Sequence, residues 1–537
     1  MAISYIRWYQ HPKLLISKAH KAVILASGSF FKSSFTLSKL RLKDLHLPKN
    51  SSPSDALQEA NKLNNKNLKL QNIMFSKEIY IARRKELCRR IGKGLILLPG
   101  NVESPLNYPN NTYHFRQDST FLYFFGHNVP SLVGVIDAES GVATLYGDDF
   151  TVDDIIWMGP QPTIADFAFE VGVEAAKPMA QLQCDIAAAV ITGREVHYLP
   201  PYRGETKLML ADLLGIQPAM LHARKSIDLL FAVAEMREKK SAEEIAALEE
   251  AFEIGYQMHT TAMLNTRPGR SEHEVAGMVD GMALRYGTGT SFTTILSQHG
   301  EVLHNHDHSG ILEEGRLLLC DAGGEHMNGY VSDHTRTFPV GGKFTQKQKD
   351  VYNIVLAAHD AAAEALRPGM MYSELSDVAS RTLLEGLKGL DLVRGSVDDA
   401  LAAGAAYLFM PHGLGHGIGL DVHDCENIGE RSFSFEPLAE RAKASACCIT
   451  RAWWRLDVGT VLSDEPGIYF VPALIDKMEA EGKYKGIVNY DKLKEYRDFG
   501  GIRLEDDLLV TESGCKIIGD KTIPITVEDV EAIVGQN

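Results

Sequence analysis

The sequence predicts a mixed α/β (α+β) chain whose C-terminal half contains two copies of one structural unit. Two observations predict this class. Helix-period stripes of apolar residues alternate with short apolar runs that end in acids, and the order helix, Arg-Pro-Gly turn, helix and strand occurs twice, with the turns at residues 267–269 and 367–369. A chain of 537 residues is long enough for two or more domains. We expect an N-terminal mixed α/β domain over residues 74–236 and a duplicated C-terminal domain over residues 237–537.

The first 73 residues differ in composition from the rest of the chain. They hold 12 Lys and Arg against three Asp and Glu, a charge of +9. They could be an organellar targeting leader, which is typically basic and acid-poor, a disordered extension, or the product of an upstream start before a natural start at Met74. We treat residues 1–73 as a leader or disordered extension outside the fold, and we favour disorder or an upstream start over targeting.

The remaining composition limits the partners and the compartment. The net charge of −15 leaves −24 on the rest of the chain, which argues against nucleic acid as a partner. No apolar stretch approaches the ~20 residues that span a bilayer, so no membrane partner is expected. Seven scattered cysteines without a C-x-x-C pair indicate reduced thiols. We therefore expect a cytoplasmic protein, with organellar targeting by residues 1–73 as the alternative.

The N-terminal domain is expected to begin with a helix over residues 76–91 and a strand over residues 94–98. The apolar runs at residues 121–125 and 132–136 also predict strands. Arg116 lies among aromatic residues just before them, and by itself it indicates no function.

The first copy of the repeated unit begins with two helices, each preceded by a capping box. The boxes are Ser241 with Glu244 and Ser271 with Glu274. A strand over residues 315–321 follows and ends in an acid.

The second copy repeats this order. Its helices are expected to begin at Thr345 and near Ser373, and its strand covers residues 459–465 and ends in Glu465. Two such copies would set their acidic strand ends facing each other across a pseudo-twofold axis.

Asp321 and Asp333 belong to one predicted hairpin, and its register decides whether they meet. A two-residue loop at Asn328-Gly329 would leave the two carboxylates on opposite faces. A three-residue loop over residues 327–329, with Gly329 in the left-handed region, pairs Gly323 with Asp333 and brings both acids to one face. We predict the three-residue loop, because two acids on one face suit a cation.

Further candidate ligands come from the second copy. A glycine-rich run over residues 411–424 contains His412, His416 and His423. Four carboxylates and one imidazole, without a thiolate, suit two hard or borderline divalent ions such as Mn²⁺. Arg503 lies two residues from one of these acids and could orient a carboxylate. The expected metal ligands are Asp321, Asp333, His416, Glu465 and Glu505, with Asp333 and Glu505 as the bridging pair.

From Tyr80 to Gly519 the chain resembles the pita-bread metallopeptidases, in particular their Xaa-Pro aminopeptidase and prolidase branch. The resemblance rests on six segments: FRQDSTFLYFFG, HNHDH, DAGGEHMNGYVSDHTRTFP, HGLGHGIGLDVHD, DEPGIYF and GIRLEDD. It differs in three places: one extra residue between the two aspartates, the Trp-bearing stretch over residues 427–456, and the leader.

The resemblance implies a pita-bread catalytic domain with two divalent ions, usually manganese, and an activated water that attacks the peptide bond before proline. It implies that Glu465 also passes a proton to the leaving nitrogen, that His423 polarises the carbonyl, and that His304 and His412 line the substrate side. Tyr469 is a supporting candidate. The family implies proline-containing peptides as substrates and a homo-oligomer, either dimer or tetramer.

Three alternatives stay open within or beside this family. A prolidase restricted to Xaa-Pro dipeptides shares the same ligands, so the motifs do not separate it from the aminopeptidase. Methionine aminopeptidase fits less well, because the N-terminal domain is too large. The same fold also occurs in metal-free binding proteins, but those lose the ligands that this chain keeps.

Overall fold

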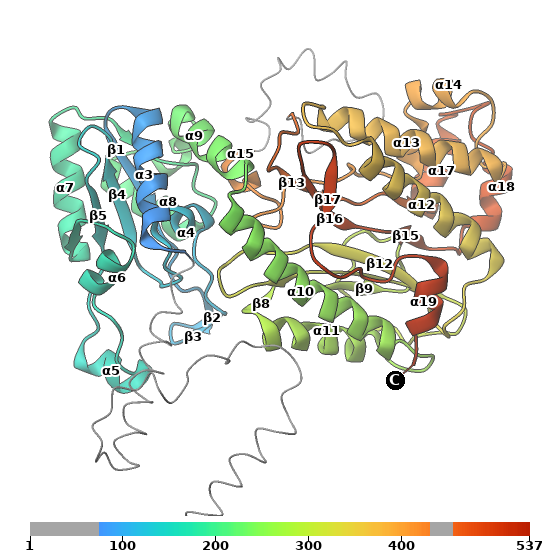
Figure 1. The fold of residues 1–537 in the computed structure, drawn as a ribbon, viewed down its shortest axis with the longest axis horizontal. Helices are drawn as coiled ribbons and strands as arrows, with labels where there is room; N and C mark the ends of the chain where they lie inside the picture. The colour runs from blue at the N-terminus through green and yellow to red at the C-terminus, as the bar shows by residue number, and fades with distance from the viewer. Residues whose placement is uncertain (1–74, 430–454, 537) are drawn as a thin grey trace, which may run out of the picture. The chain divides into compact units, whose positions relative to one another are not determined.

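The computed structural model describes residues 75–429 and 455–536, and Figure 1 shows their helices and strands. The expected leader over residues 1–73 and most of the stretch over residues 427–456 lie outside the described residues. The described residues all belong to one compact unit, which covers residues 72–537. The boundary expected between residues 236 and 237 stays a prediction. Within the described ranges, no helix is both long enough and apolar enough to cross a bilayer.

The N-terminal part is built on a mixed five-stranded sheet with the strand order β6-β5-β4-β1-β7. Strand β1 pairs antiparallel with β4 and parallel with β7, while β5 pairs parallel with β6. The strands are β1 (Leu95–Pro99), β4 (Val133–Asp137), β5 (Ala143–Tyr146), β6 (Ala175–Lys177) and β7 (Val196–His197), beside a separate hairpin of β2 (Pro105–Tyr108) and β3 (Asn111–Thr112).

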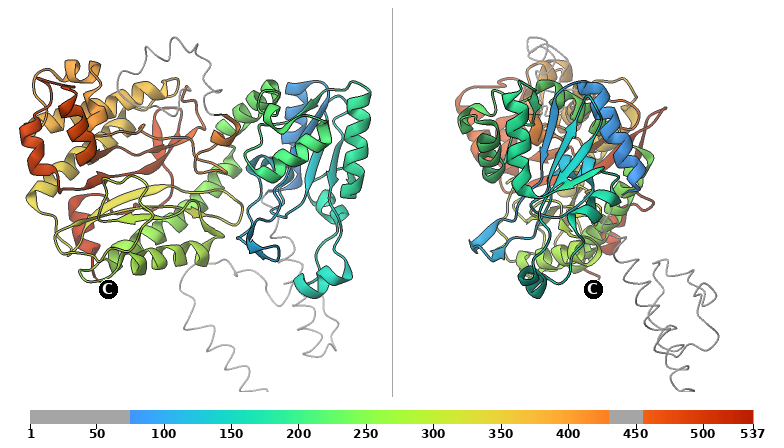
Figure 2. Two further views of the ribbon diagram at one scale, coloured as in Figure 1. Left: turned by 180° about the vertical axis from the view of Figure 1, so that it is seen from behind. Right: turned by 90° about the vertical axis from the view of Figure 1, so that its left-hand side faces the viewer.

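Helices cover both faces of this sheet (Figure 2). Alternate side chains of β1 point to opposite faces, so Ile96 packs in the cluster of α3 and α4 whereas Leu97 packs in the cluster of α7 and α8. The helices are α3 (Lys77–Ile91), α4 (Ser119–Phe125), α5 (Val152–Met158), α6 (Ile164–Glu170), α7 (Met179–Ile191), α8 (Gly204–Leu214), the 3₁₀ turn η2 (Pro218–Met220) and α9 (Ile227–Glu238).

The expected strand over residues 121–125 is wrong, because these residues form most of α4. Asp118 caps the helix by accepting a hydrogen bond from the Phe121 amide, and Gly126 ends it in the left-handed region. Every residue of α4 is buried, so the run has no polar face that would reveal a helical period. The helix expected over residues 76–91 and the strands expected over residues 94–98 and 132–136 are confirmed as α3, β1 and β4.

The first copy of the repeated unit has the predicted order. Both capping boxes form, and they start α10 (Ala242–Asn265) and α11 (Glu272–Tyr286). The strands that follow are β9 (Ile295–Ser297), β10 (Leu317–Ala322) and β12 (His334–Pro339), in the order β12-β10-β9, with β8 (Gly289–Thr290) paired to β11 (Gly324–Glu325).

The second copy follows with α12 (Gln346–Ala365) and α13 (Tyr372–Gly389). Its main sheet has the order β13-β16-β17, formed by β13 (Val461–Asp464), β16 (Asp506–Val510) and β17 (Cys515–Ile517), and β14 (Gly467–Tyr469) pairs with β15 (Gly501–Arg503). The remaining elements are α14 (Val397–Ala402), η3 (Ala405–Leu408), α15 (Glu426–Gly429), α17 (Pro472–Ala480), α18 (Tyr490–Leu493), η5 (Lys494–Tyr496) and α19 (Val527–Ile533).

Matching backbone bonds confirm the duplication. The amide of Gly269 donates to the carbonyl of Leu312 at 2.8 Å, and the amide of Gly369 donates to that of Leu456 at 2.6 Å. Each bond ties the turn between two helices to the chain that enters the next strands. In Figure 1, α10 and α11 lie on one side of the catalytic strands and α12 and α13 lie on the other.

Arg336 joins the two copies on the face of the strands opposite to the one that carries Asp321 and Asp333. It is fully buried, its Nη2 lies 2.8 Å from Asp506 Oδ1, and its Nη1 donates to the Glu505 carbonyl at 2.7 Å. Burial alone would raise the pKa of Asp506, but Arg336 and His359 hold it below its ordinary value. This buried pair therefore fixes the backbone on which Glu505 stands.

Replacing Arg336 by Met should leave Asp506 charged, buried and without its main partner. We expect the free energy of unfolding, measured by urea denaturation, to fall by ~3–5 kcal/mol. The matched control is Arg394→Met, which breaks an ion pair with Asp391 whose side chains are more than half exposed and should cost at most ~1 kcal/mol. Equal losses in the two variants would contradict the role assigned to Arg336.

Candidate metal centre

One cavity of about 350 Å³ brings together the nine residues that the sequence nominates as ligands or catalytic groups, and Tyr469 contacts two of them, His412 and Arg503, from behind the wall. Apolar side chains, among them Ile295 and Val422, complete its wall. The nominated residues that line it are His304, Asp321, Asp333, His412, His416, His423, Glu465, Arg503 and Glu505.

Asp321 and Asp333 reach the cavity from one hairpin. Strands β10 and β12 pair antiparallel, and the ladder extends to His326, whose amide donates to the Tyr330 carbonyl at 2.9 Å. Three residues close the loop, and the last of them, Gly329, has φ of 82°. The predicted three-residue loop and its register are confirmed, so both carboxylates lie on the same face.

The second copy supplies the remaining candidate ligands through similar strand ends. Glu465 follows β13 directly, and the neighbouring Ser463 holds the glycine-rich run because its Oγ accepts from the His416 amide at 3.1 Å. Glu505 lies between β15 and β16 and forms an antiparallel bridge with Thr335 of the first copy. The bridge places acids from both copies against each other.

The donor atoms of Asp333, His416 and Glu505 lie within 4.8 Å of one another. His416 Nε2 lies 3.5 Å from Asp333 Oδ2 and 3.6 Å from Glu465 Oε1. These spacings suit donors that surround a shared cation.

The buried carboxyl groups of the cavity are difficult to ionise at the same time. Burial raises the pKa of Asp333 well above its ordinary value, and the neighbouring charges of Glu505 and Asp321 raise it further. Burial, followed by the charge of Asp321, raises the pKa of Glu505 to about 8. Without a compensating positive charge, Glu505 therefore holds a proton at neutral pH, and Asp333 is harder to ionise than an ordinary aspartate.

The donor set fits a divalent cation by a second criterion. Asp321 Oδ1 and Asp333 Oδ1 are buried, and neither has a hydrogen-bond partner among the described residues. Buried carboxylate oxygens without partners are costly, and a cation would satisfy them. Oxygen-rich ligands with one imidazole and no thiolate fit ions such as Mn²⁺ better than structural zinc.

Arg503 connects the carboxylates to the substrate side of the cavity. Its Nη2 donates to Asp321 Oδ2 at 2.5 Å, and its Nη1 donates to the Tyr469 hydroxyl at 2.9 Å. The same hydroxyl lies 2.8 Å from His412 Nε2. Burial lowers the pKa of Arg503, but Tyr469 and Asp321 more than offset that effect and hold it above its ordinary value. Arg503 is therefore a permanent cation that orients Asp321.

The nominated histidines occupy two different settings. The ring of His423 lies against that of His416 with centroids 3.8 Å apart, and its Nδ1 is 2.6 Å from Glu426 Oε1. His304 also lines the cavity but is exposed.

The residues at the site that were not nominated from the sequence include Thr335, His306 and Glu426. Thr335 Oγ1 donates to Glu505 Oε2 at 2.7 Å and accepts from Arg503 Nε at 3.0 Å. Strand alternation could have found it, because it lies two residues after Asp333 on the same face. His306 lines the cavity within the quoted HNHDH segment, whereas Glu426 carries no local sequence signal.

Comparison with known proteins identifies relatives over most of the chain. The sequence matches metallopeptidase family M24 over residues 246–512 and the aminopeptidase P N-terminal domain over residues 80–197. It is 31% identical over 478 residues to a Xaa-Pro aminopeptidase of Escherichia coli strain K12, covering 86% of this chain and 98% of the relative. It is 29% identical over 496 residues to a Xaa-Pro dipeptidase of Homo sapiens, covering 88% and 95%.

The fold is similar to solved structures as well. A low-pH form of aminopeptidase P from E. coli superimposes with a TM-score of 0.71 at 29% identity, covering 86% of this chain and 98% of that chain. A zinc-substituted form of the same enzyme, in complex with product, gives a TM-score of 0.69 at 28% identity, covering 86% and 98%.

Thr335→Val should keep the shape of the strand but remove the hydroxyl that joins Glu505 to Arg503. We expect divalent-ion affinity, measured by titration of the chelated protein, to fall by roughly 10–100-fold, as is usual when a partner of a ligand is lost. Thr335→Ser keeps the hydroxyl and is the matched control. Equal affinity in Val and Ser variants would show that the hydroxyl does not support the site.

Proposed function

The chain belongs to metallopeptidase family M24, and from that premise we propose that this hydrolase is a Xaa-Pro aminopeptidase. It removes an N-terminal residue that precedes proline and uses two divalent ions, with Mn²⁺ as the preferred metal. The observation that carries the proposal is the convergence of five nominated ligands from two chain copies on one cavity, two of them with unpartnered buried oxygens.

In this proposal the ions are held by the two copies together. Divalent ions in such a site supply Lewis-acid polarisation of a carbonyl and acidification of a water molecule. The residues that would hold the ions are Asp321, Asp333, His416, Glu465 and Glu505.

The remaining residues act on the substrate and on protons. Glu465, with Oε2 3.8 Å from His412 Nδ1, takes up a proton and delivers it to the leaving nitrogen. His423 steadies the negative charge that develops on the carbonyl oxygen. Arg503 orients Asp321, and His304 and His412 hold the peptide at the cavity wall.

A prolidase restricted to Xaa-Pro dipeptides is the second candidate, favoured by the similarity to Xaa-Pro dipeptidases. We favour the aminopeptidase because the E. coli aminopeptidase is matched over 98% of its length and because solved aminopeptidase P structures share the fold. A metal-free binding protein is the least favoured candidate, because buried carboxylate oxygens without hydrogen-bond partners would destabilise it.

We also propose that the chain acts in the cytoplasm as a homo-oligomer, dimer or tetramer. In support, α5 exposes several large apolar side chains, a pattern typical of contact surfaces. Their exposed fractions are Val152 74%, Ile156 70%, Trp157 84% and Met158 64%.

A series of substrates of increasing length separates the two peptidase candidates. We expect Mn²⁺-loaded protein to cleave Xaa-Pro-Yaa and longer peptides faster than the Xaa-Pro dipeptide, with kcat/KM measured for each. A strict preference for the dipeptide would replace the aminopeptidase by the prolidase, and inactivity on the whole series would refute both.

Asp333→Asn and His416→Ala should each remove a metal ligand. We expect stoichiometric metal to disappear from the dialysed protein, measured by elemental analysis, and activity to fall by more than the ~100-fold that loss of a ligand's partner costs. Asp307→Asn, at an exposed aspartate near the cavity rim, is the control and should keep metal and activity. Full metal content in either ligand variant would contradict the assignment.

A further inference from the structure

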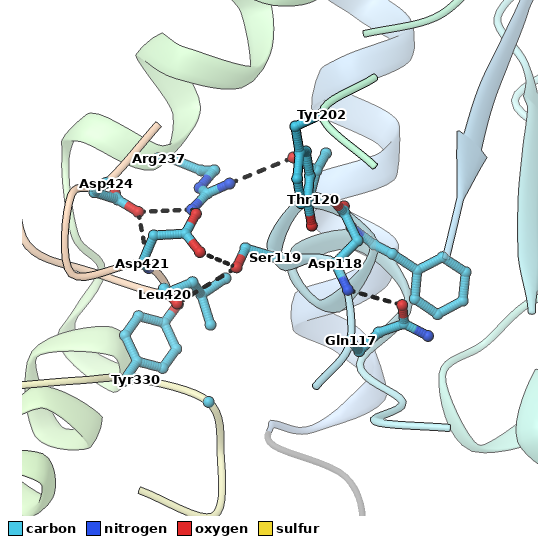
Figure 3. A network of polar contacts seen from close by, with 12 residues as sticks. Gln117, Asp118, Ser119, Thr120, Tyr202, Arg237, Tyr330, Leu420, Asp421 and Asp424 are labelled. Atoms are coloured by element: carbon cyan, nitrogen blue, oxygen red, sulfur yellow. Dashed lines mark hydrogen bonds and ion pairs between the residues drawn. The ribbon is translucent and has the colours of Figure 1, made fainter. Parts of the chain in front are cut away.

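The loop that carries His423 is held from behind by the N-terminal part of the chain. Val422 and His423 line the cavity, whereas Leu420, Asp421 and Asp424 contact residues of α4, α9 and the segment before α4. Figure 3 shows Ser119 from α4 and Arg237 from α9 converging on Asp421. The wall of the cavity therefore has backing from residues about 180 to 300 positions away in the sequence.

Two side chains donate hydrogen bonds to the Asp421 carboxylate. Ser119, which is 2% exposed, donates from Oγ to Asp421 Oδ1 at 2.5 Å. Arg237, also 2% exposed, donates from Nη2 to Asp421 Oδ2 at 2.9 Å and to Asp424 Oδ1 at 2.6 Å. Lys240 Nζ donates to the other oxygen of Asp424 at 2.9 Å. Residues on both sides of His423 are thus held by partly buried, charge-assisted hydrogen bonds.

Arg116 ties this loop to the hairpin that carries Asp321 and Asp333. Its Nη2 donates to the Leu420 carbonyl at 2.5 Å and to the Gly329 carbonyl at 3.1 Å. Its Nε donates to Glu325 Oε2 at 2.8 Å, and its Nη1 donates to Ser119 Oγ at 2.7 Å. The planar guanidinium presents these donors in a fixed fork, so one side chain sets the spacing of several segments.

Opposite charges are paired within this cluster. Three cations, Arg116, Arg237 and Lys240, form ion pairs with three carboxylates, Glu325, Asp421 and Asp424. The carboxyl group of Asp118 also interacts electrostatically with Asp421, Arg237 and Arg116. Burial alone would raise the pKa of Asp424, but Arg237 and Lys240 lower it to about 2. Asp424 therefore stays ionised at neutral pH and holds both cations.

We propose that Arg116, Ser119 and Asp421 are positioning residues that hold His423 in place for turnover. The proposal rests on the function proposed above, because it assigns His423 a role toward the substrate carbonyl. A displacement of about 1 Å in a catalytic group costs up to ~100-fold in rate, so a loop held by hydrogen bonds on its far side controls kcat without touching the substrate.

Ser119→Ala is the sharpest test, because it removes one hydroxyl and adds no bulk. We expect kcat on Xaa-Pro-Yaa to fall about tenfold, within the range that small displacements produce, while KM changes less than about twofold and metal content stays stoichiometric. Asp421→Asn, which keeps the shape but loses the charge, should act in the same direction. Full kcat in both variants, with the wild type active, would overturn the proposal.

The matched control is Arg84→Gln. Arg84 is also a buried arginine of the N-terminal part, but it donates to the carbonyls of Phe124, Val171 and Gly172, away from the His423 loop. Its loss should destabilise the protein and leave kcat of the folded enzyme unchanged. A tenfold loss of kcat in this variant would show that general destabilisation, and not positioning, explains the Ser119 result.

A double-mutant cycle separates positioning from a purely structural role. If Ser119 acts through His423, then Ser119→Ala should cause no further loss in a His423→Ala background, whereas independent effects would multiply. Hydrogen–deuterium exchange gives a readout that needs no activity: Ser119→Ala should speed exchange in residues 417–428 and leave the strands of the hairpin unchanged.

The outcomes keep the two proposals apart. An inactive wild type would defeat the proposed function, while faster exchange in residues 417–428 would still support the bracing of the loop. Unchanged exchange together with multiplicative losses would overturn the positioning role even if the wild type cleaves every substrate.

Discussion

Mutual repulsion among buried carboxylates is the constraint on which this structure depends. Asp333 and Glu505 lie with Asp321 and Glu465 around one cavity, and burial together with the neighbouring carboxylate charges raises the pKa of the first two. A fold can keep four carboxylates this close only if its backbone fixes their positions away from solvent and a positive charge lies between them. The proposed divalent ions would supply that charge, and the surrounding residues hold the geometry.

The backbone fixes these carboxylates because the two copies are joined directly beside them. The Thr335–Glu505 bridge brings strands of the two copies together, and the Thr335 hydroxyl holds the Glu505 carboxylate on the cavity side. On the opposite side, Arg336 holds the carbonyls of the same two residues. The Thr335–Glu505 bridge and the Arg336 guanidinium therefore support the same part of the backbone. Loss of either support would disturb the same carboxylates.

The sequence predicted what local rules determine. Turn chemistry left two loops open at Asn328-Gly329, and the three-residue loop was predicted because strand alternation then places Asp321 and Asp333 on one face, where they suit a cation. The strand expected over residues 121–125 was wrong because a fully buried run has no polar face to show its period. Thr335 fits the strand alternation, but it was not nominated because its side chain carries no charge. The contacts between Ser119 and Asp421 depend on tertiary packing across about 300 residues, which no local pattern encodes.

The two walls of the cavity are supported by different means, and this difference gives the N-terminal part a function. The four proposed carboxylate ligands lie on or beside paired strands of the two copies, and Ser463 of β13 holds the backbone at His416. His423 lies on a loop without regular secondary structure, and side chains from outside those copies hold it. The two proposals therefore predict that ion binding and substrate orientation can be separated in this chain: a change at Ser119 should alter turnover, whereas a change at Thr335 should alter the affinity for the ions.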